Sequence, residues 1–278
     1  MAFVRRTLTR GHESNRRRRP RTPDRGRRDA LTGAGVSVPS GVPPFRGEGG
    51  ISASEASGGS SDVSDGIWSE YDPDTFDVHR FRRDPGGFWA DWLELRSDLF
   101  DASVEPNAAH DALAALSARN HLDAVVTQNI DGLHGDAGSD EVLELHGNAR
   151  RAVCQRCGRA VPAADVRERV RDGERPPRCE TENCDGVLKP DAVLFGERLP
   201  AEALARAERL AADSDVFLVA GSSLTVEPAA SLPARAAESG ATLILVNLDE
   251  TPLDARADYV FREDVTEVLP ALRDAVVG

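Results

Sequence analysis

No run of about 18 or more apolar residues occurs in this chain, and no apolar signal-peptide core follows its first methionine. The first absence predicts that no helix crosses a membrane, and the second argues against export. Without an export signal, we expect the four cysteines to remain reduced in a cytoplasm instead of forming disulfides. The sequence therefore predicts a cytoplasmic protein with no membrane partner.

Lysine is nearly absent, because Lys189 is the only one among 278 residues. The formal net charge is −13 and is unevenly distributed: residues 1–29 hold 11 arginines and 3 acidic residues, whereas the remainder holds 23 basic and 44 acidic residues. Many carboxylates with few lysine stems are typical of a surface that stays soluble at high salt, where screening weakens charge repulsion. This acidic body argues against a nucleic-acid partner, and only the Arg-rich N-terminal segment suits one.

All four cysteines lie in one stretch, as CQRC and CETENC separated by 21 residues. A short C-x(2–4)-C turn presents two thiolates at about the 2.3 Å reach that zinc requires, and two such turns complete a tetrahedral shell. The alternatives are free thiols or two disulfides. We predict a structural zinc ion, and since four sulfurs leave no open position, the chemistry should lie elsewhere. The predicted ligands are Cys154, Cys157, Cys179 and Cys184.

Apolar strands and helical patterns alternate along most of the chain. This alternation predicts an α/β fold with a Rossmann-like parallel sheet and helices on both faces. The cysteine stretch interrupts the alternation, so we expect it to form an inserted small zinc-ribbon/helical domain. Strands are predicted at 123–127, 215–221, 241–247 and 257–261, and helices at 88–100, from 106 onward, and at 200–211, 228–238 and 265–276.

The same patterns suggest where the domains begin and end. We expect a basic, disordered or non-native extension at 1–29 and a Rossmann-like nucleotide-binding domain from 30–47 with 105–150 and 190–278. A flexible Gly/Ser loop and helical module should occupy 48–104, and the zinc module 151–189. A buried apolar strand normally precedes a glycine-rich turn such as that at Gly33, but only Ala30 and Leu31 stand before it. We therefore expect the first strand to be missing or replaced, as a shifted start site or reading frame would produce.

Small or polar residues follow four of the segments expected to form the sheet. Because ligands bind at the carboxyl ends of parallel strands, we expect these four segments to form one site. The first turn departs from the dinucleotide fingerprint, since Val38 stands where its third glycine would fall and no strand-end acid follows about 20 residues on. A bound nucleotide is predicted, but a hydride-transferring dehydrogenase is not. The segments are Gly33–Gly35, Thr127–Asp131, Gly221–Ser223 and Asn247–Asp249.

His146, in ELHGN, is the candidate general base, because the ordinary pKa of histidine suits proton abstraction near neutral pH. A histidine that only packs or caps a turn is the alternative. His134, in DGLHG, is its closest rival, and residue chemistry alone does not choose between them.

Together these residues resemble the sirtuin family of NAD-dependent protein lysine deacylases. The resemblance covers roughly residues 31–278 apart from the Gly/Ser loop. Five segments carry it in family order, with VLFGE between the cysteines and the fourth: GAGVSVPSGVPPFRG, TQNIDGLH, LHGN followed by the four cysteines, AGSSLTVEPA, and VNLDETP.

The resemblance implies a role for each matching position. His146 would be the catalytic base, and Asn129 would also act in catalysis. An acetylated protein segment would bind as an extended strand along Val193, Phe195, Gly196 and Glu197. The implied NAD-binding residues are Gly33, Ala34, Gly35, Ser37, Phe45, Arg46, Gln128, Asn129, Ile130, Asp131, Gly221, Ser222, Ser223, Asn247, Leu248, Asp249 and Val265.

The implied reaction converts acetyl-lysine and NAD to lysine, nicotinamide and O-acetyl-ADP-ribose. Family members that remove acidic acyl groups carry a Tyr and an Arg where Trp92 and Leu95 stand here, so we expect uncharged acyl groups. Two other functions remain open at this point. One is NAD-dependent transfer of ADP-ribose to protein, and the other is a catalytically impaired zinc-containing protein whose zinc lobe and Arg-rich segment bind nucleic acid.

Overall fold

A computed structural model describes residues 26–45, 72–99 and 104–278. Its main layer is a six-stranded sheet in the order β3-β2-β1-β7-β8-β9, and every neighbouring pair is parallel. This confirms the predicted parallel α/β fold. The strands are β1 (Arg28–Thr32), β2 (Ala124–Thr127), β3 (Val142–Glu144), β7 (Val216–Ala220), β8 (Thr242–Val246) and β9 (Tyr259–Phe261).

A first strand is present, so the prediction that it is missing is wrong. β1 lies inside the sheet and pairs with β2 on one side and β7 on the other. One of its polar residues, Asp29, is 1% exposed, and its carboxylate accepts hydrogen bonds from Arg27 Nε at 2.8 Å and from Ser214 Oγ. A buried carboxylate is tolerated when it is paired in this way, so two apolar residues and these partners are enough for the strand.

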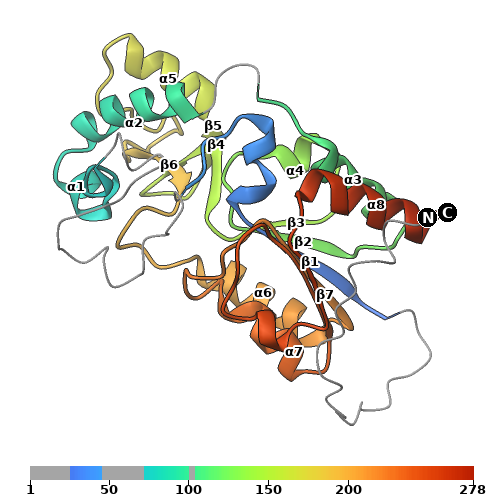
Figure 1. Cartoon of the computed structure of the whole chain (residues 1–278). Helices are drawn as coiled ribbons and strands as arrows, with labels where there is room; N and C mark the ends of the chain where they lie inside the picture. Colours follow the sequence, from blue (N-terminus) through green and yellow to red (C-terminus); the bar gives the residue numbers. More distant parts are fainter. Residues whose placement is uncertain (1–25, 46–71, 100–103) are drawn as a thin grey trace.

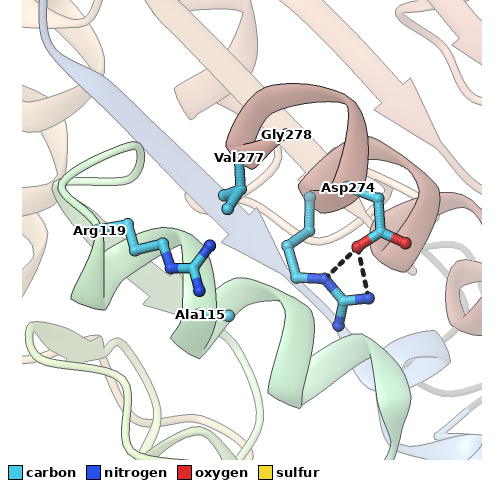
Figure 2. Close-up of a pocket in the computed structure, with 6 residues that line it drawn as sticks. Ala115, Arg119, Asp274, Val277 and Gly278 are labelled. Carbon is cyan, nitrogen blue, oxygen red and sulfur yellow. Dashed lines mark hydrogen bonds and ion pairs between the residues drawn. The ribbon is translucent and has the colours of Figure 1, made fainter.

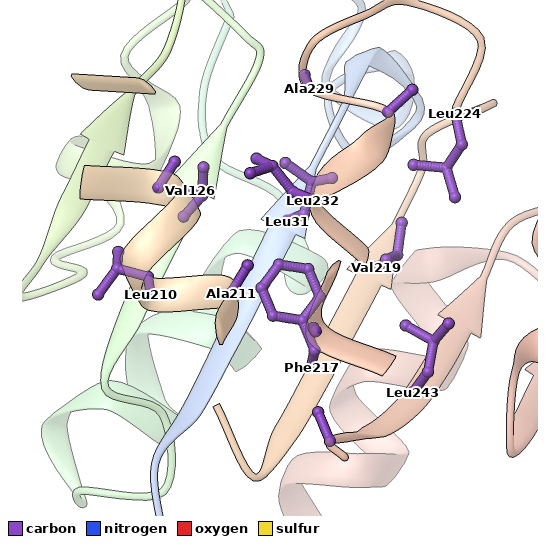
Figure 3. Packing of buried hydrophobic residues seen from close by; sticks show 14 of the residues in the cluster. Leu31, Val126, Leu210, Ala211, Phe217, Val219, Leu224, Ala229, Leu232 and Leu243 are labelled. Atoms are coloured by element: carbon purple, nitrogen blue, oxygen red, sulfur yellow. The ribbon is translucent and has the colours of Figure 1, made fainter. Parts of the chain in front are cut away.

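Alternate residues of each strand enter two different cores, as the two-residue period of a strand requires. Leu31, Val126 and Phe217 pack under α6 (Ala201–Asp213) and α7 (Ser231–Glu238) (Figure 3). Their neighbours Val125 and Leu218 pack on the other face under α3 (Ala108–Ala118) and α8 (Val265–Val277). Figure 1 shows these two pairs of helices on opposite sides of the sheet.

A smaller lobe holds the cysteines. Its antiparallel sheet has the order β5-β4-β6, with β5 (Ala160–Pro162), β4 (Gly147–Cys154) and β6 (Leu188–Ala192), and α5 (Ala163–Arg171) follows β5. The helices α1 (Val78–Arg83) and α2 (Pro85–Leu99) share one apolar cluster with this lobe (Figure 1). Trp89 of α2 belongs to that cluster, and its Nε1–H donates to the Leu188 carbonyl at 2.8 Å.

Short elements complete the fold: η1 (Ala34–Val36), η2 (Val38–Ser40), η5 (Pro73–Phe76), α4 (Leu133–Asp136) and η6 (Asp254–Arg256). Each predicted strand contains an observed one, and each predicted helix overlaps an observed one. β4 and β6 run across the expected boundaries of the zinc module, at 150/151 and 189/190. Among the residues described, no helix is both long and apolar enough to span a bilayer.

Several predictions made from sequence fall outside the described residues. These are the Arg-rich segment up to residue 25, the Gly/Ser loop, the end of the 88–100 helix at Phe100, and the cofactor contact assigned to Arg46.

Candidate functional site

The turns that follow β1 and β7 touch through bare backbone. The Gly35 N–H donates to the Gly221 carbonyl at 2.9 Å, and a Cβ added to Gly35 would lie 2.8 Å from the Gly221 Cα. A Cβ on Gly33 would lie 2.7 Å from the Gly221 oxygen, and Gly221 itself has φ +59. No side chain fits between these turns, so their backbones meet directly at the ends of β1 and β7, and bare glycine backbone of this kind can approach a phosphate group closely.

Side chains after β2 connect this surface into one unit. Gln128 Nε2 donates to Ser222 Oγ at 2.9 Å, which joins the ends of β2 and β7. Asn129 Nδ2 donates to the Gly33 carbonyl at 3.1 Å and to Ser37 Oγ at 3.0 Å, which joins β2 to the first turn. Three of the four segments predicted from the sequence therefore meet through hydrogen bonds.

Asp131 anchors the same network from the interior. Its carboxylate accepts from Ser37 Oγ at 2.7 Å and from the Leu133 N–H at 2.8 Å. Ser37 Oγ therefore accepts from Asn129 while it donates to Asp131. This fixes which way the Asn129 amide points, since its nitrogen is held by Ser37 and the Gly33 carbonyl.

Two buried histidines, His110 and His134, lie behind these residues with ring centroids 4.9 Å apart. Thr32 Oγ1 donates to Thr127 Oγ1 at 2.9 Å, so it must accept from His134 Nε2 at 2.8 Å, which fixes the tautomer of that ring. Thr127 Oγ1 in turn accepts the Asn129 N–H at 3.1 Å. His134 is thus tied into the packing behind Asn129.

Burial controls the protonation of both rings. It lowers the pKa of His134 to about 3, with His110 as a second, repulsive cause. It also lowers the pKa of His110, against an opposing effect of the Asp131 carboxylate. Both rings are therefore neutral at pH 7. Thr32 and His110 were not among the residues predicted from the sequence, because their importance arises only from contacts between distant segments.

His146 follows β3 and lies between the sheet and the smaller lobe. Its carbonyl accepts the Val193 N–H at 2.9 Å, and nearby the Ala149 N–H donates to the Ile130 carbonyl at 2.8 Å. Burial lowers the pKa of His146, with an opposing effect from the Gln128 main chain. Its Nδ1 atom is buried and has no hydrogen-bond partner among the described residues. A neutral imidazole of this kind can accept a proton from a bound ligand.

The predicted substrate edge continues directly from Val193. Phe195 is already paired on one side, because its N–H donates to the Phe76 carbonyl at 3.2 Å and its carbonyl accepts the Val78 N–H at 2.9 Å. Its ring stacks on Phe45 of the first turn at 6.4 Å. Within the described ranges, the main-chain N–H and carbonyl of Gly196 take part in no hydrogen bond. That residue therefore supplies the open edge.

The fourth predicted segment lies one strand further along the sheet. The Gly221 N–H donates to the Val246 carbonyl at 2.9 Å, which places residues 247–249 beside the β7 turn. Asn247 Nδ2 bonds to the Asp249 carbonyl at 2.9 Å, Leu248 is 65% exposed, and Val265 is buried at the start of α8. Among the described residues, the side chains of 247–249 form no hydrogen bond with the other three segments, so they adjoin the network without being tied to it.

The four cysteine sulfurs lie within 4.8 Å of one another. Cys154 and Cys184 are 3.6 Å apart, and Cys157 and Cys179 are 3.8 Å apart, measured between Sγ atoms. A tetrahedral zinc site with bonds of about 2.3 Å has sulfur–sulfur edges of about 3.8 Å. The donor set and its spacing therefore fit zinc.

A surface hollow of about 370 Å³ lies elsewhere, between the C-terminal ends of α3 and α8 (Figure 2). Asn107, just before α3, donates to the Val36 carbonyl, so α3 begins at the strand ends and runs away from them. The hollow is therefore remote from the site above and contains none of the residues predicted from the sequence. Its lining residues are Ala115, Arg119, Arg273, Asp274, Val277 and Gly278.

Comparison with known proteins gives one consistent result. The family model described as "Sir2 family" matches residues 33–228. A relative from Haloarcula marismortui, named NAD-dependent protein deacetylase, is 54% identical over 87% of this chain and 87% of its own length. One from Sulfolobus acidocaldarius with the same name is 43% identical over 87% of this chain and 86% of its own.

Solved structures agree with the sequence relatives. A Sir2 structure with a p53 peptide and NAD+ has a TM-score of 0.72 and 35% identity, covering 90% of this chain and 93% of the other. Another, with a deacetylated p53 peptide and 3′-O-acetyl ADP ribose, has a TM-score of 0.74 and 36% identity, covering 91% and 93%. The chain belongs to the Sir2 family.

Proposed function

We propose that this protein is an NAD-dependent protein lysine deacetylase. The observation that carries the proposal is one arrangement: a neutral, half-buried His146 whose carbonyl accepts the Val193 N–H, between the glycine turns for phosphates and the peptide edge at Gly196. The names of the Haloarcula and Sulfolobus relatives support the same activity.

The glycine turns fit the proposed cofactor, because a Cβ at Gly33, Gly35 or Gly221 would clash and bare backbone is what a pyrophosphate can approach closely. Gly33, Ala34, Gly35 and Gly221 would hold the pyrophosphate of NAD, and Asn129 and Asp131 would hold the nicotinamide half. Residues 247–249 and Val265 would hold the adenosine half. When bound, NAD would supply a ribosyl carbon that can lose nicotinamide to the acyl oxygen and a ribose hydroxyl that can take the acyl group.

His146 would accept the proton of a ribose hydroxyl. Its lowered pKa keeps the ring neutral, and so able to act as a base, throughout the neutral range. Asn129 would orient the ligand, because its amide nitrogen is fixed by Ser37 and the Gly33 carbonyl while its oxygen remains for other contacts.

The substrate would be an acetylated protein segment in extended form. The peptide would add as a strand and pair with the Gly196 main chain, and the side chains of Val193 and Phe195 would line the channel for the acyl-lysine side chain. The p53 peptides in Sir2 structures support a peptide as ligand. Trp92 and Leu95 are buried in the apolar cluster of the smaller lobe, which fits a preference for uncharged acyl groups.

The test uses the purified chain in high salt with NAD and an acetyl-lysine peptide, and follows the peptide by mass. Loss of acetyl only in the presence of NAD, abolished by His146→Ala, is the expected result. A mass gain of ADP-ribose on the peptide would instead favour transfer to protein. No change in the peptide would overturn both enzymatic readings, provided that the protein melts cooperatively and holds zinc.

A further inference from the structure

The only lysine of the chain is buried at the substrate edge. Lys189, in β6, is 8% exposed. Its Nζ donates to the Ala192 carbonyl at 2.6 Å and to Glu197 Oε2 at 2.8 Å. A lysine is rarely buried without a counter-charge, because desolvation of the ammonium is costly. Glu197 supplies that charge, and its side chain is 20% exposed.

Glu197 in turn closes a tight turn. The Glu197 N–H donates to the Leu194 carbonyl at 3.0 Å, and Glu197 Oε2 accepts the Leu194 N–H at 2.9 Å. Gly196 occupies the third position of this turn with φ +75, as a type II turn requires. Both ends of the turn are thus held by one carboxylate, and that carboxylate is held by Lys189.

This turn presents the peptide edge. Val193, next to it, is bonded to the His146 carbonyl, and Phe195 is bonded on its other side to Phe76 and Val78. The direction of the open Gly196 N–H and carbonyl therefore depends on the turn keeping its shape. Because the Glu197 carboxylate is occupied by Lys189 and Leu194, its role is to shape this edge.

We propose that Lys189 is a positioning residue for the acyl-peptide substrate, acting through Glu197 on the turn at 194–197. The proposal rests on the proposed deacetylase function. Lys189 touches neither the phosphate surface nor the Asn129 network. Its loss should therefore weaken peptide binding while leaving NAD binding and the chemical step nearly unchanged.

Steady-state kinetics of Lys189→Met test this separation, with Lys189→Arg as the charge-conserving control. We expect the peptide KM to rise about tenfold or more in K189M, with kcat and the NAD KM within about twofold of the parent. K189R should restore most of the peptide affinity. A peptide KM unchanged in K189M, or an equal loss in kcat and NAD affinity, would overturn the proposal.

A double-mutant cycle keeps the test decisive if K189M leaves Glu197 buried without its partner and unfolds. The double variant K189M/E197Q removes both charges, so it should fold. If the two residues act as a unit, its peptide KM should match that of the single variant Glu197→Gln, which keeps no buried carboxylate and can be compared even if K189M unfolds, whereas a further loss beyond Glu197→Gln would contradict a shared role.

A binding measurement separates this inference from the proposed function. Selective ¹⁵N-lysine labelling gives a single main-chain amide signal, because the chain has one lysine. An acetyl-lysine peptide should shift this signal, and NAD alone should leave it nearly unmoved. If the parent protein deacetylates the peptide but the signal does not shift, the proposed role of Lys189 is wrong while the proposed function stands. If the parent protein neither binds nor deacetylates the peptide, the proposed function itself is wrong.

Discussion

The Val193 N–H donates to the His146 carbonyl at 2.9 Å, so the proposed base and the first residue of the substrate edge are joined by one main-chain hydrogen bond. This bond connects the end of the parallel sheet to the strand that leaves the cysteine lobe. The smaller lobe therefore contributes directly to the geometry of the site, although its metal ligands take no part in the chemistry.

The pH dependence of activity should follow the environment of His146. Burial lowers its pKa from the ordinary 6.5, so the ring stays neutral down to a lower pH than a free histidine. We expect kcat/KM to be flat through neutral pH and to fall only below about pH 6.5, as protonation removes the base. An acid limb centred at or above pH 7 in a kcat/KM profile would contradict this environment.

Alanine at Gly221 should be destabilising for two reasons, the close approach of the β1 and β7 turns and the positive φ, and a second glycine separates them. A Cβ there would lie 2.4 Å from the Val36 nitrogen, and φ is +59. Gly240 is the matched control, because it has φ +97 but no atom within 4 Å of an added Cβ. Gly240→Ala should cost only about 1 kcal/mol of left-handed strain.

Gly221→Ala should cost more than the control in thermal melting, and it should weaken NAD binding at least tenfold by calorimetry, because the phosphate surface must move. Equal effects of the two variants would show that close approach of the turns does not matter.

Removal of zinc should unfold the smaller lobe. Cys154 and Cys179 belong to the same apolar cluster as Trp89 and Trp92, so loss of the metal removes support from α2 as well. Structural zinc contributes about 10–16 kcal/mol of apparent binding free energy in small domains. Cys184→Ser should lose the bound zinc and lower the melting temperature, with metal content measured by atomic emission. Full zinc content in this variant would exclude the four-sulfur site.

Asp29 should destabilise the protein at neutral pH. Burial raises its pKa above 3.8, against the opposing effects of Ser214 and Arg27, and its Oδ1 has no partner among the described residues. The folded state therefore binds the Asp29 proton more tightly than the unfolded state does. As a result, the contribution of Asp29 to the free energy of unfolding falls as the pH rises above about 4. Asp29→Val should therefore stabilise the fold, by about 1–4 kcal/mol, and by more at pH 7 than at pH 5.

Arg27→Ala gives the opposite control, since it leaves the Asp29 carboxylate with Ser214 as its main partner. It should destabilise the protein by about 1–3 kcal/mol at pH 7 in urea titrations. A loss of stability in Asp29→Val at pH 7 would show that the buried pair contributes more than its desolvation costs.

The order of strands and helices was predictable because apolar runs and their small or polar followers are local features. DAVVT, DVFLVAG and ATLILVN are apolar runs of strand length, and Gly221 marks the turn at the end of the second. The cysteine site was equally accessible, since ligand type and spacing suffice.

The parts that sequence reasoning missed depend on distant partners. β1 was rejected for its polar residues, but Asp29 is paired by Ser214, 185 residues away. Thr32 matters only because Thr127 and His134 meet it in the folded chain. Glu197 was expected to contact substrate, yet its carboxylate is held by Lys189, a contact that the local motif does not reveal.

The most direct test of the account counts two products of one reaction. The protein, NAD and an acetyl-lysine peptide are incubated together, and nicotinamide and deacetylated peptide are quantified over the same interval. We predict one nicotinamide released for each acetyl group lost, and neither product with His146→Ala. Acetyl loss without NAD, or nicotinamide release matched by ADP-ribose on the peptide, would contradict the proposed deacetylase.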